Sequence, residues 1–300
     1  MTHTAVTSNT IEADRLVGPA RVVEQYLASY IDERPLPGNL REAVRYALLG
    51  SGKRLRPILT IRACEAVGAE PAMALAPAGA IELIHCFSLV HDDLPAMDDD
   101  DLRRGRPTLH RHTNEAMAIL AGDLMMGLAF ELIAARVQPA DLMSQVSAEL
   151  TQATNDMIMG QVYDTLPDFE PSIPPMDRLK TTHHHKTGAL IRCACRMGAL
   201  CGGADGVQLN AITRYAQAIG LMFQVVDDLL DVTQSTEHLG KAANKDAQKG
   251  KLTYPGLLGV DQTRAEVKRL HCEAIQALAP LGDGAAALRE LCDFMAVRQK

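Results

Sequence analysis

The segment from Asp92 to Asp101 carries six aspartates in ten positions, and Arg103 and Arg104 follow it at once. Two kinds of structure explain such crowding. One is a solvent-exposed acidic loop, and the other is a site where carboxylate oxygens hold a divalent cation, as Mg²⁺ prefers. Because arginine binds phosphate oxygens in a bidentate manner, a metal-bound phosphate would also account for the two arginines.

A second acidic motif lies in the sequence "FQVVDDLLD". Asp227 and Asp231 are four residues apart in a strongly helical segment, so they share a helix face with Gln224, while Asp228 lies beside them. Like charges at this spacing destabilise a helix, and an apolar segment is a poor place for unpaired carboxylates. A bound divalent cation would compensate for both effects, although an ordinary exposed helix end explains a single motif of this kind equally well.

The first motif has a similar pair, Asp92 and Asp93, at the end of the apolar helix expected for residues 80–93. If that helix continued, Asp98 would point roughly 120° away from Asp92, at 100° per residue. Pro95 can break the helix, so that the chain brings Asp98 back towards the same cation. Asp99 is the alternative ligand if the helix runs straight.

Three basic clusters could bind phosphate groups. They are "GSGKRLRP" (50–57) with Lys53, Arg54 and Arg56, "HHHKTG" (183–188) with Lys186 and Thr187, and residues 239–255 with Lys241, Lys251, Lys245 and Lys249. We expect Asp100 and Asp101 to be solvated or paired with Arg103 and Arg104. Each basic cluster alone is more often a solvated surface, but together with two acidic motifs they predict a site for a metal-bound diphosphate.

The segments that carry these motifs have the periodicity of helices. Apolar residues recur at three- and four-residue steps in 13–31, 39–49, 114–133 and 209–232. Breaks rich in Pro and Gly fall at 34–39, 68–77, 166–175, 201–206 and 279–284. No alternating run of β-branched residues indicates a strand. We therefore expect an all-α fold in which residues 1–300 form one domain, with about ten frayed residues at the start.

Two segments, 120–130 and 215–226, are apolar nearly all round. This pattern is typical of helices in the middle of a large bundle. Apolar surface on other helices could be buried within the chain or by a second subunit, and the sequence does not separate these alternatives.

Composition excludes several classes of protein. The net charge of −7 argues against a nucleic-acid binder, which usually carries a basic excess. The longest charge-free stretch, 215–226, is too short to span a bilayer, and the N-terminus lacks the features of a secretory signal. Seven cysteines, an odd number in a long chain, predict reduced thiols and a cytoplasmic protein. The spacings in "CACRMGALC" and "HHH" match no common zinc site.

The ordered set of motifs resembles the trans-isoprenyl (polyprenyl) diphosphate synthases, and among them the bacterial farnesyl diphosphate synthases. The match runs from "GSGKRLRP" through "SLVHDDLPAMDDDDLRRGRPTLH", "GQVYD", "HKTGAL" and "FQVVDDLLDV" to "GKLTYP". The resemblance implies an isoprenoid synthase-type helical bundle, usually a homodimer, around a deep central cavity. It also implies head-to-tail condensation of isopentenyl diphosphate with dimethylallyl or geranyl diphosphate, in which two or three Mg²⁺ ions, or Mn²⁺, assist ionisation of the allylic substrate.

The resemblance also implies roles for individual residues. The implied metal ligands are Asp92, Asp98, Asp227 and Asp231, with Asp93 and Asp228 in the same catalytic motifs. The implied contacts to the allylic diphosphate are Arg103, Lys186, Thr187, Gln224, Lys241 and Lys251, of which Arg103, Lys186 and Lys241 take part in catalysis. Those to isopentenyl diphosphate are Lys53, Arg56, Arg104 and His85. His85 has independent support, because it lies seven residues before Asp92 on the same helix face.

The length of the product would be set beneath the first acidic motif. Ser88 lies four residues before Asp92, and Phe87 lies beside it, about 7.5 Å below Asp92 at 1.5 Å per residue. A phenyl ring there can close the pocket for a prenyl tail. An aromatic residue at this position also resembles the farnesyl-making enzymes, so we predict farnesyl diphosphate as the product. The alternative is that Phe87 only packs in the core.

Three other functions share some of these features. A geranylgeranyl diphosphate synthase has nearly every motif. A terpene cyclase also ionises an allylic diphosphate, but it needs no second diphosphate site, so the 50–57 cluster argues against it. A non-catalytic regulatory subunit of a heteromeric synthase would commonly lack aspartates from one motif, whereas both motifs are intact here.

Overall fold

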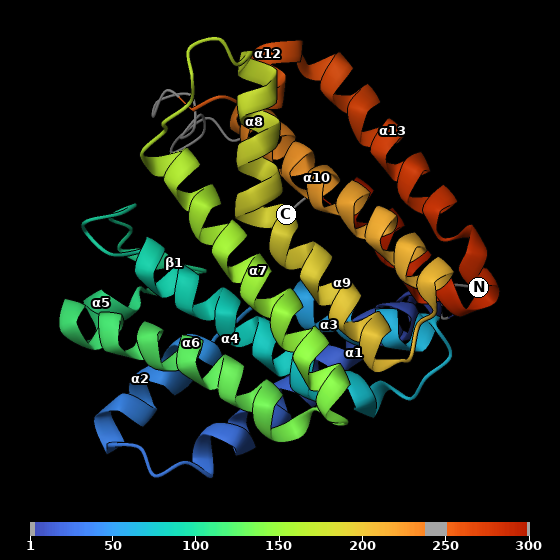
Figure 1. The fold of residues 1–300 in the computed structure, drawn as a ribbon. Coiled ribbons are helices and arrows are strands. Elements are labelled where there is room, and N and C mark those ends of the chain that lie inside the picture. The colour runs from blue at the N-terminus through green and yellow to red at the C-terminus, as the bar shows by residue number, and fades with distance from the viewer. Residues whose placement is uncertain (1–3, 238–250, 299–300) are drawn as a thin grey trace.

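The computed structural model describes the backbone of residues 4–237 and 251–298, with side chains described in 18–233 and 251–298. It is a bundle of α-helices with one small hairpin at its edge (Figure 1). The α-helices are α1 (Thr4–Asp32), α2 (Gly38–Leu48), α3 (Leu55–Ala66), α4 (Leu75–Asp92), α5 (Leu109–His112), α6 (Glu115–Arg136), α7 (Ala140–Thr165), α8 (Pro175–His183), α9 (Ala189–Cys201), α10 (Gly206–Glu237), α12 (Tyr254–Leu258), α13 (Val260–Ala277) and α14 (Ala286–Val297). The remaining elements are the 3₁₀ helices η1 (Pro71–Ala74) and η3 (Ala279–Ala285), the π-helical segment η2 (His184–Gly188), and the antiparallel strands β1 (Leu102–Arg103) and β2 (Arg106–Pro107).

The all-α class is confirmed, and most breaks fall where Pro and Gly predicted them. Residues 166–174 separate α7 from α8, and residues 202–205 separate α9 from α10. Two details differ from expectation. Helix α1 begins at Thr4 rather than after about ten frayed residues, since residues 4–17 contain neither Gly nor Pro. The hairpin was not expected, because strands of two residues leave no periodic signal in a sequence.

Helix α10, which carries the second acidic motif, has a well-defined start. The Gln208 backbone N–H donates to Oδ1 of Asp205 at 2.8 Å, and the Asp205 N–H donates to Oε1 of Gln208 at 3.1 Å. This reciprocal pair is a capping box, which satisfies two of the donors that a helix start leaves free. Gly203, at φ +75°, ends the preceding turn in a conformation that favours glycine.

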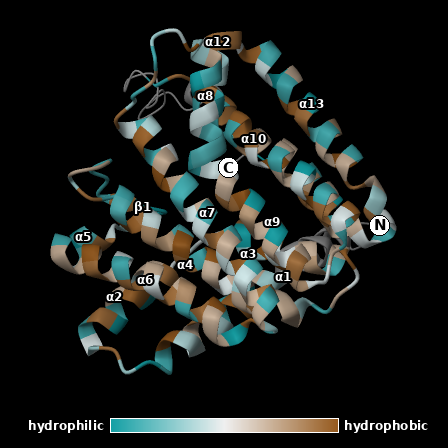
Figure 2. Cartoon of the chain, in the orientation of Figure 1, coloured by the Kyte–Doolittle hydropathy of each residue, from teal (hydrophilic) through white to brown (hydrophobic). Residues whose placement is uncertain are grey.

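Helix α4 runs through the interior and packs against α3 and α6. The segment 215–226 of α10 is also largely buried, as expected. Helix α6 is different, although it too is brown along most of its length in Figure 2. Ile119 and Leu120 are 44% and 57% exposed, so the expectation that this apolar helix lies in the middle of the bundle is wrong. Periodicity reports how apolar a helix is, but not what covers it.

Two helical stretches, Pro71–Asp92 and Glu115–Arg136, are long and apolar enough to cross a membrane by length and composition alone. Within the bundle, 72% of the first apolar window and 44% of the second is buried. Core helices of globular proteins give the same signal, so the expected absence of a membrane span remains a prediction.

Candidate active site

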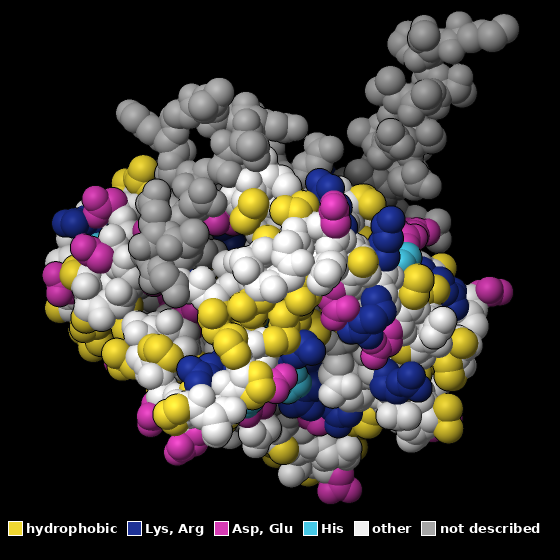
Figure 3. Space-filling view, turned by 90° about the horizontal axis from the view of Figure 1, so that it is seen from above, with side chains coloured by type: hydrophobic (Ala, Val, Ile, Leu, Met, Phe, Trp, Pro, Cys, Tyr) yellow, Lys and Arg dark blue, Asp and Glu magenta, His cyan; other side chains and the backbone are white. Residues whose placement is uncertain are grey.

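The carboxyl ends of α4, α7 and α10 point towards the upper left of the bundle in Figure 1, close to the hairpin and to α8. Seen from above, Lys and Arg side chains in dark blue gather near the middle of the face, beside hydrophobic side chains in yellow (Figure 3). The candidate site residues of the first and second acidic motifs come from these helix ends.

The first acidic motif folds back on itself. Helix α4 ends at Asp92, and a turn follows that contains Pro95. The backbone N–H of Asp98 donates to the backbone oxygen of Asp92 at 2.8 Å. This hydrogen bond brings Asp98 next to Asp92, as expected from Pro95. Asp99 has φ +54°, which carries the chain away from the helix direction.

Asp93 has a different partner from Asp92. Asp93 is 3% exposed, and its carboxylate accepts hydrogen bonds from Nε of Arg103 at 2.8 and 2.9 Å and from Nη2 at 2.5 Å. The pair fastens the hairpin to the end of α4. Asp101 pairs with Arg111 instead of the two arginines expected. Arg103 is bound to Asp93, and Arg104, in the turn after β1, donates to the backbone oxygen of Ser51 at 2.7 Å.

Asp92 carries charge that the protein compensates only in part. Burial raises the pKa of Asp92 to about 6. The neighbouring positive charge of Lys186 lowers this pKa, whereas the negative charge of Asp98 raises it further. Hard carboxylate oxygens in such a place fit a divalent cation. Among the residues that the structure describes, no three His, Cys, Asp or Glu side chains form a ready-made cage. That suits Mg²⁺, which typically binds one or two carboxylates together with waters and substrate phosphates.

Lys186 and Lys251 meet at one carboxylate. The Nζ atoms of both lysines donate to Oδ2 of Asp164, each at 2.6 Å. These two positive charges, with their hydrogen bonds, lower the pKa of Asp164 despite its burial. Lys186 lies in the π-helical segment between α8 and α9, a type of irregularity that is frequent at functional sites. Gly160 lets α7 approach, since a Cβ atom there would lie 2.1 Å from the backbone nitrogen of Lys186.

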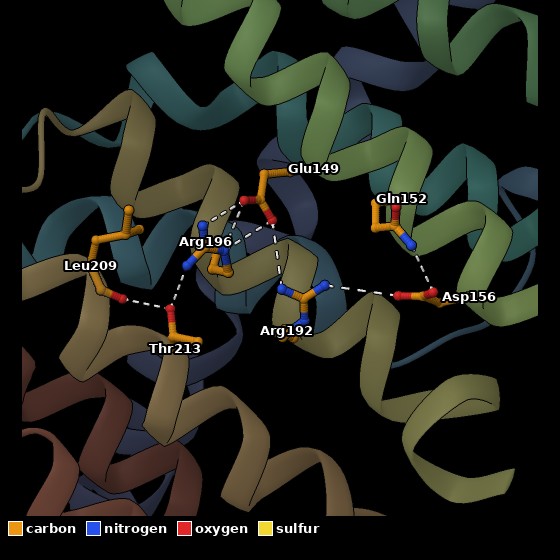
Figure 4. Close-up of polar contacts among 7 residues, drawn as sticks. All are labelled: Glu149, Gln152, Asp156, Arg192, Arg196, Leu209 and Thr213. Atoms are coloured by element: carbon orange, nitrogen blue, oxygen red, sulfur yellow. Dashed lines mark hydrogen bonds and ion pairs between the residues drawn. The ribbon is translucent and has the colours of Figure 1, made fainter. Parts of the chain in front are cut away.

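Further ion pairs hold α9 beside α7 (Figure 4). Arg196 donates to both carboxylate oxygens of Glu149 at 2.5–2.9 Å, and Arg192 lies 3.9 Å from Asp156. The residue numbers rise along α9 as they fall along α7, so the helices are antiparallel and the Lys186–Asp164 pair continues the series. This ladder of ion pairs therefore fixes the register that places Lys186 opposite Asp164.

In the second motif, the two neighbouring aspartates have separate partners. Asp227 accepts a hydrogen bond from Nη2 of Arg298 at 2.5 Å, and the Arg298 guanidinium stacks on the Phe223 ring at 4.0 Å. Asp228 is buried and accepts from the backbone N–H of Tyr254 at 2.9 Å. Asp228 thus anchors the segment that carries Lys251, whereas Asp227 faces the site.

Asp231 and Gln224 lie one turn after and one turn before Asp227 on α10, both half-buried. Lys53 reaches the same region. Partial desolvation and the charge of Arg298 lower the pKa of Lys53, and Asp227 opposes that change. The structure therefore brings the 50–57 cluster to the second acidic motif.

Two of the residues expected to bind isopentenyl diphosphate, Arg56 and Arg104, lie close to a third, His85. Burial and the charges of Arg56, Arg104 and Arg103 hold the pKa of His85 well below its usual value, so the imidazole is neutral. In the described part of the chain, the buried Nε of Arg56 has no hydrogen-bond partner. An anion would satisfy it. Arg54 has a structural role, because it is 3% exposed and bound to Glu82 at 2.7 Å.

The residues expected beneath the first motif lie on α4. Phe87 is buried, at 6% exposed, and Oγ of Ser88 donates to the backbone oxygen of His85 at 2.9 Å. Thr187 is buried within η2, and Lys241, with Lys245 and Lys249, lies outside the described residues. A cavity of about 60 Å³ lies beside Asp93 and the hairpin arginines, and one of about 500 Å³ lies between η2, α10 and α13.

Sequence reasoning missed two polar residues of this site. Asp164 belongs to "GQVYD", a motif that contributes to the resemblance but by itself suggests no role for this residue. Its position four residues after Gly160, where α7 packs closely against Lys186, is the feature that could have identified it. Arg298 is 71 residues from Asp227 in the chain, and nothing local marks it. The assembled site brings several cations and carboxylates together at the ends of apolar helices, which suits an anionic, metal-bound ligand with a hydrophobic part.

Known proteins resemble this chain over most of its length. A model of the polyprenyl synthetase family matches residues 37–280. Geranylgeranyl pyrophosphate synthase 11, chloroplastic, of Arabidopsis thaliana is 45% identical over 269 residues, covering 87% of this chain and 75% of that protein. A geranyltransferase from Legionella pneumophila has a similar structure, with a TM-score of 0.84, 33% identity, and coverage of 96% of this chain and 98% of that one. An FPP/GFPP synthase from Zymomonas mobilis is also similar in structure, with a TM-score of 0.82 and 31% identity. The match covers 98% of this chain and 100% of that one.

Proposed function

The chain belongs to the polyprenyl synthetase family and is a trans-prenyl diphosphate synthase, and from that premise we propose that it makes farnesyl diphosphate. The substrates would be isopentenyl diphosphate and the allylic dimethylallyl and geranyl diphosphates. The observation that carries the proposal is the burial of Phe87 on α4, one turn and a half below Asp92.

We propose that Asp92 and Asp98 from one motif, and Asp227 and Asp231 from the other, hold Mg²⁺ together with the allylic diphosphate. When bound, the cation stabilises negative charge on the departing diphosphate. Lys186, Lys251 and Arg103 bind the same diphosphate and favour its departure electrostatically. Apolar side chains of α4 and the neighbouring helices exclude water from the allylic cation.

The second diphosphate would bind between Lys53, Arg56, Arg104 and His85. The unsatisfied Nε of Arg56 supports this assignment, and neutral His85 can donate one hydrogen bond there. Isopentenyl diphosphate held in this place presents its double bond to the allylic cation. The released diphosphate is the base that we propose for the final proton loss.

The direct test is to incubate the purified protein with isopentenyl diphosphate and each allylic primer, with Mg²⁺ or after exhaustive chelation. We expect farnesyl diphosphate with the metal and no condensation after chelation. Undiminished turnover without a divalent cation would contradict the metal-bridged site. The second candidate is geranylgeranyl diphosphate synthesis, which the 45% identity to a geranylgeranyl pyrophosphate synthase favours.

Phe87→Ala should lengthen the product to geranylgeranyl diphosphate or beyond while the enzyme stays active. The phenyl ring closes the pocket, so its removal opens room for another isoprene unit. Phe130→Ala, which removes a half-buried ring on α6, is the control for the loss of a phenyl group. If Phe87→Ala retains the wild-type product and only loses about 3–5 kcal/mol of stability, Phe87 is a core residue and the farnesyl assignment loses its support.

We further propose that the protein is a homodimer through the apolar side of α6. Ile119 and Leu120 expose large neighbouring side chains there, and contiguous exposed apolar surface is typical of protein–protein interaction sites. Leu120→Glu should weaken the dimer by about a hundredfold in Kd, because the interface would bury a charge. Analytical ultracentrifugation measures this change. Val207→Glu, which alters a more exposed apolar residue at the start of α10, should leave the assembly intact. A monomeric wild type would contradict the proposal.

The seven cysteines are free thiols, six of them buried. Burial raises the pKa of several of these thiols, for example Cys193 and Cys195, which makes them unreactive. Their burial and raised pKa values support a structural role for these cysteines as reduced thiols. Reduced thiols in turn support our proposal that the protein is cytoplasmic.

A further inference from the structure

His91, the residue before Asp92, connects α4 to α6. Its Nε2–H donates a hydrogen bond to the backbone oxygen of Ile119 at 3.1 Å. The same nitrogen lies 4.0 Å from Oδ1 of Asp123. The imidazole ring is therefore held on one side by the backbone of α6, next to the place where α4 ends.

The His91 ring lies directly against Gly122 of α6. A Cβ atom on Gly122 would lie 2.2 Å from Nε2 and 2.6 Å from Cδ2 of His91. These distances are far inside van der Waals contact. Gly127, five residues further along the same helix, has no atom within 4 Å of such a Cβ. A larger residue at position 122 would therefore have to displace the histidine ring, whereas one at position 127 would meet no neighbour.

His91 also packs against Phe87, one turn earlier on α4. The two rings meet edge to face, with centroids 5.8 Å apart and planes inclined at 76°. Aromatic rings favour this arrangement. The hydrogen bond to Ile119 fixes the imidazole. If the Phe87 ring moved, the imidazole could move with it only by breaking this hydrogen bond.

We infer that His91 is a specificity-determining residue that fixes the position of the Phe87 ring, and with it the length of prenyl chain that the pocket accepts. The inference rests on the proposed function, because it concerns the product of the same reaction. The inference predicts whether each variant makes longer or shorter products than the wild type. It therefore holds whether the wild-type product is farnesyl or geranylgeranyl diphosphate.

Two substitutions should change the product in opposite directions. His91→Ala removes the support, so the Phe87 ring can turn into the vacated space and the pocket becomes deeper. Gly122→Ala pushes the imidazole away from α6 and towards Phe87, and the pocket becomes shallower. In the double variant His91→Ala/Gly122→Ala the clashing ring is absent, so the effect of Gly122→Ala should disappear.

The experiment compares product ratios of the full-length enzyme, with isopentenyl diphosphate and dimethylallyl diphosphate as substrates, for the wild type and these variants. We expect His91→Ala to raise the ratio of the next longer product to the wild-type product about tenfold, equivalent to about 1.4 kcal/mol between the two barriers. Gly122→Ala should shift the ratio towards shorter products, and the control Gly127→Ala should match the wild type. A product ratio does not depend on how much enzyme is folded, so a purely structural role would leave it unchanged.

An active His91→Ala enzyme with the wild-type ratio would overturn the role of His91 and leave the proposed function standing. So would a Gly122→Ala effect that persists in the double variant. A wild type that condenses no substrates would overturn the proposed function itself, and this inference with it. If Gly122→Ala does not fold, His91→Ala alone decides the question.

Discussion

We expect Asp92→Asn to lower kcat about a thousandfold, the loss of several kcal/mol of transition-state stabilisation. Asp92 lies next to Asp98 through a 2.8 Å backbone hydrogen bond, and its carboxylate faces the charge of Lys186. Asparagine keeps the shape of the side chain but loses the anionic oxygen that a divalent cation needs. Steady-state kinetics at saturating Mg²⁺ measure the effect.

The same substitution should not destabilise the folded protein at pH 7.5. The pKa of Asp92 is raised to about 6 in the folded state, so ionisation opposes folding increasingly from about pH 4 and fully above about pH 6. Asparagine removes this cost, and the free energy of unfolding should rise by about 2–3 kcal/mol. The difference should vanish as the pH falls from 6 to 4, where the carboxylate is protonated in the folded protein. Denaturant unfolding at several pH values, without metal, tests this prediction.

Asp99→Asn is the matched control for both measurements. Asp99 is exposed and has a left-handed backbone conformation that asparagine also adopts readily. It should have nearly wild-type kcat and stability. A large loss of activity in Asp99→Asn, with little in Asp92→Asn, would mean that Asp99 is the metal ligand instead.

Lys186→Ala should lower kcat/KM for the allylic primer by about a hundredfold, with a much smaller effect on the KM for isopentenyl diphosphate. Lys186 is held by Asp164 on the side of the first acidic motif, where its charge reaches Asp92. Arg56→Ala should show the reverse pattern, because Arg56 lies with His85 in the other cluster. Initial rates with one substrate varied at a time separate the two effects.

Lys180→Ala is the control for removing a lysine from this part of the chain, since Lys180 is exposed on α8. We expect no change in either KM. Equal effects of Lys186→Ala and Arg56→Ala on both substrates would contradict the division into two diphosphate sites.

The sequence predicted those parts of the site that depend on local rules. The end of α4 and the return of Asp98 follow from Pro95, whose ring is incompatible with a continuing helix. The shared face of Asp227 and Asp231 follows from helical spacing alone. These features depend on residues that are close together in the chain, so a pattern can report them.

Other features depend on contacts between distant segments, and no local pattern reports them. Asp164 on α7 accepts from Lys186 in η2 and from Lys251 near α12, which requires three helices to be in place. The pairing of Arg298 with Asp227 joins α10 to the end of the chain. The exposure of Leu120 was mispredicted for the same reason, because burial depends on neighbours that the sequence of α6 does not name.

The shared carboxylate of Asp164 has a consequence for the thermodynamics of substrate capture. Ordering a lysine side chain costs conformational entropy, and in this protein Lys186 and Lys251 are already ordered by hydrogen bonds of 2.6 Å to the same oxygen. Most of that entropy is therefore lost when the chain folds, and little remains to be lost when a diphosphate arrives. A diphosphate also meets two positive charges that lie side by side at one carboxylate, so its own negative charge is attracted by both. The site is thus preorganised for an anion before any substrate is present.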